Sequence, residues 1–194
     1  MAWRNSATSW GTGSKLFHWT MALLILGSAI FILHVNDSTW WFASSPAVFI
    51  KYIHWHKAFG LMALALVIGR LLWRRGNLLP SVAPLTPFEQ RASKWTHAGL
   101  YALMVIVPLT GWIASSAFGS PTKFFGLFTI PGIIPKTKEL VAPGYWSHFV
   151  VSWVLLGLVA VHAAAAIYHH VRRKDAVLRA MWFSPRAGKQ GEAE

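Results

Sequence analysis

Two histidines, His148 and His162, lie fourteen residues apart in one apolar stretch of the chain. At 100° per residue, this separation places the two imidazoles about 40° apart around a helix and about 21 Å apart along it. Ionisable side chains inside a membrane helix are costly, and they usually face the interior of the helix bundle. Two imidazoles on one inward stripe, near opposite membrane surfaces, suit two metal centres stacked across a bilayer. This arrangement favours transmembrane electron transfer.

The composition is that of a membrane protein. The chain has 194 residues, of which 55% are hydrophobic and only 12% are charged, about half the charged share of a soluble domain. Apolar runs long enough to cross a bilayer lie near residues 16–35, 53–73, 97–115 and 146–171. They predict an all-α integral membrane four-helix bundle, forming one domain over residues 1–194 with a long connection at 116–145. The short apolar stretch 40–50 contains Pro46 and is expected to lie at the membrane interface.

The net charge of +12 is unevenly distributed between the two sides of the predicted bundle. Thirteen of the eighteen Lys and Arg residues precede the first span, join the second to the third or follow the fourth. By the positive-inside rule, both termini should be cytoplasmic and the 116–145 connection periplasmic. A nucleic-acid-binding protein would need a soluble basic face, and the pattern provides none.

The histidines of the predicted spans can be sorted by membrane depth. His56 begins the second span and His148 the fourth, both from the periplasmic side, whereas His18 and His162 lie toward the cytoplasmic side. Each cross-helix pair could bind one haem iron from both faces, and such six-coordinate iron suits electron transfer. The chain has no cysteine, so any haem must be bound non-covalently. His169, one heptad after His162, is a rival for the cytoplasmic ligand.

Arg70 lies fourteen residues after His56 and therefore on the same helix face. Near the depth of a cytoplasmic haem, its guanidinium could pair with a propionate. The alternative is an end-of-helix charge that extends to the membrane surface. Gly60, one turn after His56, leaves room for a flat macrocycle, whereas His54 is about 160° away and is expected to face the interface.

These residues resemble the bacterial diheme cytochrome b561 family, which includes superoxide oxidase-like proteins and the cytochrome b of nickel hydrogenases. In the family, the haem ligands fall on the positions that match His18, His56, His148 and His162. The likeness extends from Ser14 to about Met181. It rests on the His-Trp after Lys15-Leu16-Phe17, 56-HKAFG-60 followed by Arg70, 97-HAGLYALMVIVPLTG-111, and His148 through 162-HAAAAIYHH-170 with 174-KDAVLRAM-181.

The resemblance implies a cytochrome with two haem b groups in the bacterial inner membrane, with ubiquinone as redox partner. Some members look like superoxide:ubiquinone oxidoreductases, whereas others are similar to cytochrome b subunits that anchor hydrogenases or other dehydrogenases. A quinone needs an apolar entrance with polar groups for its carbonyls. The cytoplasmic candidates are His97, His169 and Arg172, with Trp95 as a wall.

The electron donor is open from the sequence. Superoxide is a small anion, and charge steering by Lys51, Lys57 and Lys123 could draw it toward a periplasmic haem. A periplasmic dehydrogenase would instead dock on the 116–145 connection. The non-redox alternative is a histidine-based metal transporter, which the absence of Asp and Glu from the predicted spans disfavours.

The charge asymmetry gives a topology test. A reporter that is active only in the periplasm should be silent when fused after Glu194 and active when inserted near Lys136. The opposite pattern would reverse the assignment of the two membrane sides while leaving the histidine pairing intact.

Overall fold

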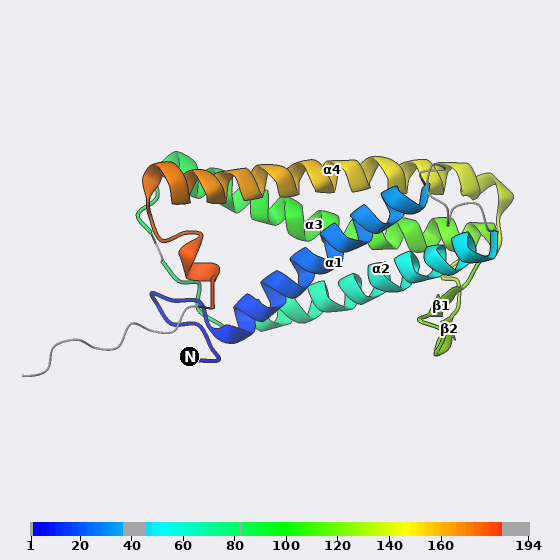
Figure 1. Cartoon of the computed structure of the whole chain (residues 1–194), viewed down its shortest axis with the longest axis horizontal. Helices are drawn as coiled ribbons and strands as arrows, with labels where there is room; N and C mark the ends of the chain where they lie inside the picture. Colours follow the sequence, from blue (N-terminus) through cyan, green and yellow to red (C-terminus); the bar gives the residue numbers. More distant parts are fainter. Residues whose placement is uncertain (1, 37–45, 82, 184–194) are drawn as a thin grey trace, which may run out of the picture.

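Four long helices make up most of the computed structural model, which describes residues 2–36, 46–81 and 83–183. They are α1 (Thr12–Asn36), α2 (Pro46–Arg75), α3 (Pro87–Phe118) and α4 (Val141–Tyr168). Each coincides for most of its length with a segment long and apolar enough to cross a membrane. All four run lengthwise along the molecule (Figure 1). The predicted all-α four-helix membrane bundle is confirmed.

The helices extend beyond the apolar runs that predicted them. α3 starts at Pro87, ten residues before His97, because Thr86 and Glu89 form a capping box. The Thr86 hydroxyl accepts from the Glu89 N–H, and the Glu89 carboxylate accepts from the Thr86 N–H at 2.7 Å. Pro46–Ile50, part of the stretch expected at the membrane interface, form the start of α2, since proline is favoured at the first helical position. Residues 37–45 lie outside the described part of the chain.

The connection between α3 and α4 has structure of its own. α3 ends at Gly119, whose φ of 81° is left-handed and whose N–H caps the helix. Strands β1 (Thr122–Phe124) and β2 (Phe128–Ile130) then form an antiparallel hairpin that pairs Thr122 with Ile130. A short 3-10 helix, η2 (Lys138–Leu140), leads into α4 five residues earlier than the predicted span.

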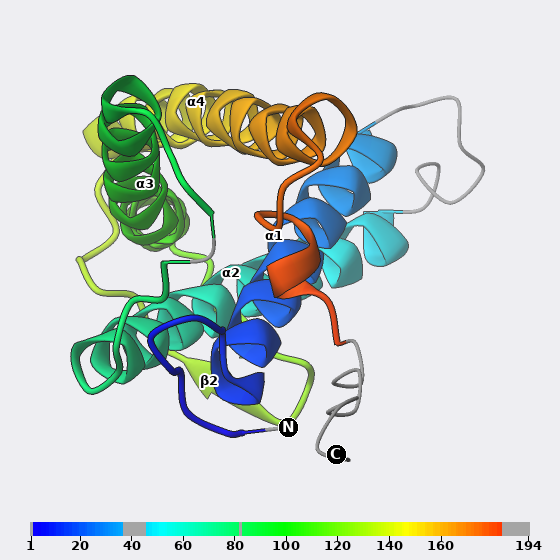
Figure 2. The same cartoon turned by 90° about the vertical axis from the view of Figure 1, so that its left-hand side faces the viewer.

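The helices pack in chain order, α1 on α2, α2 on α3 and α3 on α4. Viewed from the end that carries the termini (Figure 2), α3 and α4 form one side of the bundle and α1 and α2 the other. The contact between α3 and α4 is close at Gly144, where a Cβ atom would lie 3.0 Å from the Ala114 Cα. Small residues at such crossings allow helix backbones to approach within a membrane.

Both ends of the described chain lie at the same end of the bundle (Figure 1), as an even number of crossings requires. Beyond α4, the chain forms a π-helical turn, η3 (His169–Arg173), and a 3-10 turn, η4 (Arg179–Met181). It then returns to α1, where the Trp19 indole N–H donates to the Met181 carbonyl at 2.8 Å and Lys15 donates to the Trp182 carbonyl at 2.7 Å. The basic residues Arg186 and Lys189 lie outside the described residues.

Gly144→Ala should lower the thermal unfolding midpoint of the purified protein in detergent, because its methyl group would meet the α3 backbone at 3.0 Å. Gly157→Ala is the matched control in the same helix. A Cβ there would have no neighbour within 4 Å, and the better helix propensity of alanine contributes about 0.8–1 kcal/mol in a water-exposed helix. Equal midpoints for the two variants would contradict the close α3–α4 contact.

Candidate functional site

His56 of α2 and His148 of α4 face each other across the interior of the bundle. Their ring centroids are 6.1 Å apart. Both line a cavity of about 590 Å³ to which all four helices contribute, and which also includes Ser28, Gly60 and Gly111. The pairing predicted from membrane depth therefore brings these two side chains together at one cavity.

The second ring nitrogen of each histidine in this pair is already engaged. The His148 Nδ1 lies 3.0 Å from the Val107 carbonyl oxygen, and a carbonyl can only accept, so Nδ1 carries the proton. The His148 Nε2 is then left with its lone pair, the form that binds a metal. The His56 Nδ1 lies 2.9 Å from the Ser28 hydroxyl. These hydrogen-bond partners were not predicted, because their contact with histidine depends on how neighbouring helices are rotated.

Two glycines shape the space beside the pair. A Cβ atom at Gly111 would lie 2.9 Å from the His148 Cε1, so the imidazole rests directly against the α3 backbone. At Gly60, a Cβ atom would meet no neighbour within 4 Å, and this glycine borders the cavity. The open space that the sequence predicts beside His56 is therefore present.

His18 of α1 and His162 of α4 form a second facing pair, with ring centroids 6.2 Å apart. Arg70 is directed toward this pair, with Nη2 3.5 Å from the His18 Nδ1 and its guanidinium 5.6 Å from the Tyr101 ring centroid. Of the two interpretations of Arg70, the structure therefore favours a charge inside the bundle over one that extends to the surface. Within the described residues, every recorded ion pair involves Glu89 or Asp175, so Arg70 has no carboxylate partner there.

The ring separations fit an iron between the members of each pair. A metal–imidazole bond is about 2.0 Å long and the ring centre lies roughly 1.1 Å further on, so two rings on opposite sides of one iron are about 6.2 Å apart. The observed values are 6.1 and 6.2 Å. The His97 and His162 rings are 5.2 Å apart, too close for an iron between them. His97 is instead held by its own helix, through Nδ1 at 2.7 Å from the Ser93 carbonyl.

His169, the rival for the cytoplasmic ligand, is directed at carboxylates. Its Nδ1 lies 2.5 Å from Asp175 and its Nε2 lies 4.0 Å from Glu89. Arg173 joins the same cluster with an ion pair to Glu89 at 3.0 Å. Burial raises the pKa of the Asp175 carboxyl, but hydrogen bonds from His169 and the Val177 N–H outweigh it and hold that pKa below its usual value. The capping-box pattern of Thr86 and Glu89 could have predicted from the sequence that Glu89 lies at the start of α3. The contact of Glu89 with His169 could not be predicted in this way, because the two residues are far apart in the sequence.

The other quinone candidates and the steering lysines differ in their surroundings. Trp95 is 74% exposed, and Arg172 is also exposed. Lys51 and Lys123 are exposed, whereas Lys57 is half-buried and donates to the Ser115 and Ser120 hydroxyls at 3.1 and 3.0 Å. Lys57 thus binds at the C-terminal end of α3, where the helix dipole favours a cation.

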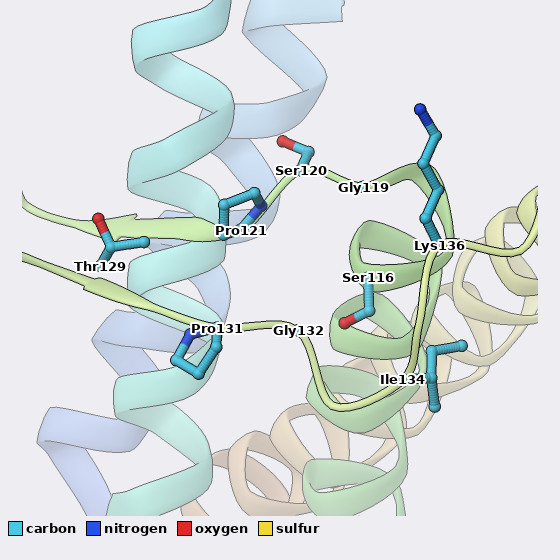
Figure 3. A pocket seen from close by; sticks show the side chains of 9 residues that line it. All are labelled: Ser116, Gly119, Ser120, Pro121, Thr129, Pro131, Gly132, Ile134 and Lys136. Carbon is cyan, nitrogen blue, oxygen red and sulfur yellow. The ribbon is translucent and has the colours of Figure 1, made fainter.

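A smaller cavity of about 400 Å³ lies between the end of α3 and the β hairpin (Figure 3). The Ser116 hydroxyl is used within the fold, because it accepts from the Ile133 N–H at 3.0 Å and donates to the Trp112 carbonyl at 2.7 Å. The Lys136 ammonium points away from Ser116 (Figure 3). The residues lining this cavity include none of the paired histidines, so it is separate from the two imidazole pairs.

A four-helix membrane bundle with facing imidazole pairs at two depths has the architecture of a membrane-bound b-type cytochrome. The chain belongs to the prokaryotic cytochrome b561 family, whose model matches residues 9–184. It is 27% identical to "Cytochrome b561 homolog 2" of Escherichia coli (strain K12) over 188 residues, covering 93% of this chain and 95% of the relative. It is also 27% identical to "Cytochrome b561 homolog 1" of the same organism over 146 residues, 73% of this chain and 80% of the relative.

Family membership and the four apolar helices establish the general class of this protein. It is a multi-pass membrane cytochrome of the b type that acts in electron transfer, and b-type haem is the cofactor that the family implies. The imidazole separations and the cavity around His56 and His148 fit that cofactor.

Proposed function

We propose that this protein carries electrons across the bacterial inner membrane, between a periplasmic donor and ubiquinone, using two haem b groups. One observation carries the proposal. Two imidazole pairs with nearly equal ring separations, 6.1 and 6.2 Å, occur at two depths of one bundle and share α4. Both termini are proposed to be cytoplasmic, so His56 and His148 lie toward the periplasm.

His56 and His148 would hold one haem through its iron, and His18 and His162 would hold the other. Bound haem b supplies reversible one-electron chemistry at iron. The protein's own part is to orient the ligands. The Val107 carbonyl holds the His148 Nδ1–H, Ser28 holds the His56 ring, and such partners fix the ring orientation and raise ligand basicity.

Arg70 is proposed to pair with a carboxylate of the cytoplasmic haem. A guanidinium without an anionic partner is costly to bury, and this one lies inside the bundle, 3.5 Å from the His18 ring. A propionate would provide the missing charge, and the fork of arginine matches a carboxylate.

Ubiquinone is proposed to bind at the cytoplasmic surface, near His97, His169 and Arg172, with Trp95 as a wall. His97 supports this position because its ring contacts that of His162. His169, hydrogen-bonded to Asp175, is a polar group near that surface. Protons are required because one quinone takes up two electrons and two protons to form a quinol.

Superoxide is the proposed periplasmic donor, which would make the protein a superoxide:ubiquinone oxidoreductase. Two superoxide anions lose one electron each, forming two molecules of oxygen, and these two electrons reduce one quinone. The exposed Lys51 and Lys123 support the attraction of a small anion to that end of the bundle. The Lys57 ammonium donates hydrogen bonds at the end of α3, so it is less available than the other two lysines to attract an anion.

The haem assignment predicts two haems per chain by pyridine haemochrome analysis, both low-spin. His56→Ala and His148→Ala should each remove the same haem and leave the other spectrum intact, and His18→Ala and His162→Ala should do the same for the second haem. His54→Ala, His97→Ala and His169→Ala are the matched controls and should retain both haems. One haem per chain, or loss of a haem in a control variant, would be incompatible with the pairing.

Stopped-flow spectroscopy of the purified, oxidised protein tests the redox partners. Superoxide should reduce the haems, faster at low than at high ionic strength because steering by exposed charges is screened by salt, and added ubiquinone should then reoxidise them. Lys51→Gln and Lys123→Gln should reduce the salt dependence. Reduction by quinol but not by superoxide would point to an anchor subunit for a dehydrogenase. No exchange of electrons with quinone in either direction would refute the quinone proposal.

A further inference from the structure

The β hairpin of residues 122–130 stands beside the bundle rather than across its end (Figure 1). It contacts α2 at two levels. At its base, the Lys123 N–H donates to the His54 Nδ1 at 3.3 Å. At its tip, the Phe125 ring packs edge-on against the Phe59 ring, with centroids 5.1 Å apart.

These two contacts give the direction of the hairpin relative to the membrane. Five residues of α2 separate His54 from Phe59, a rise of about 7.5 Å along the helix and a rotation of about 140° around it. The hairpin therefore crosses α2 obliquely, and its tip contacts α2 further from the helix start at Pro46 than its base does. Its tip lies deeper than its base.

The tip presents apolar side chains away from the protein. Leu127 is 80% exposed and Phe128 is 56% exposed. α2 also exposes apolar side chains within its candidate membrane span, Ile68 and Leu72 on the His54 face, and in a membrane-spanning helix such side chains contact lipid. The exposed apolar tip thus lies beside a lipid-facing helix.

The backbone of the tip is formed at a conformational cost. Phe125 has a φ of 50° and Gly126 a φ of 79°, and a positive φ is unfavourable for an aromatic residue. Glycine would adopt that angle freely, but it could not supply the ring that contacts Phe59 and Phe124. The phenylalanine at this position therefore fastens the turn to α2.

We propose that the hairpin tip, residues 125–128, inserts into the outer boundary between phospholipid headgroups and acyl chains. The exposed Lys123, near the base of the hairpin, is then close to lipid phosphates, as in other interfacial anchors. A deeper position is unfavourable because the outer edges of a two-stranded hairpin carry unpaired backbone groups. The inserted tip would fix the depth of the Ser120–Pro121 segment that binds Lys57.

The natural chain has no cysteine, so single labelling sites can be introduced cleanly. Leu127→Cys would carry a nitroxide spin label in the full-length protein, reconstituted into phosphatidylcholine vesicles. Collision with lipid-soluble oxygen and with a water-soluble nickel chelate would be measured by electron paramagnetic resonance. Ile68→Cys serves as the lipid-exposed reference, and Lys136→Cys, on the loop at the end of the bundle, as the aqueous reference.

The label at residue 127 should show a ratio of oxygen to nickel collisions several-fold above that at residue 136, and closer to that at residue 68. A ratio equal to that at residue 136 would overturn the proposal. Protection of residue 127 from both reagents would also overturn it, because the tip would then be covered by protein. Gel filtration and the thermal midpoint of each variant, compared with the parent, establish that the label has not disturbed the fold.

Discussion

A polar ring inside a bilayer must find its hydrogen-bond partners within the protein, and this constraint organises the bundle. The His148 imidazole reaches across to a carbonyl of α3, the His56 imidazole to a hydroxyl of α1, and the His97 imidazole to a carbonyl of its own helix. In each case Nδ1 is engaged. The partners set the direction in which the other ring nitrogen points, so the geometry of the His56–His148 pair depends on all four helices at once.

The same constraint explains why glycine occurs at the closest approaches. Gly111 lets the His148 ring lie against α3, and Gly144 brings the start of α4 onto Ala114. A side chain at either position would separate α3 from α4 and move His148 away from the Val107 carbonyl. Close packing of these two helices and orientation of the imidazole are therefore a single structural requirement.

The histidine pairing and the face of Arg70 could be predicted from the sequence, because the helices that carry these residues are continuous. His148 and His162 lie in one continuous α4, and His56 and Arg70 in one continuous α2. Residues fourteen positions apart therefore lie on the same helix face, as predicted. The start of α3 was missed because its first residues are polar and the capping box, rather than hydropathy, determines it. The hairpin was missed because three-residue strands are too short to show an alternating pattern. The contact of His169 with Glu89 and Asp175 could not be foreseen, since it depends on the path of the chain after α4.

The return of the chain to α1 has a consequence for biosynthesis. Trp19 and Lys15 obtain their partners from the carbonyls of Met181 and Trp182, which are separated from them by more than 160 residues. α1 therefore completes its contacts only after residues 181 and 182 have been translated. Until then, its indole N–H and ammonium must be satisfied by water, lipid headgroups or the insertion machinery. Truncation at the C-terminus would leave the N-terminal helix, rather than the last one, without part of its native contacts.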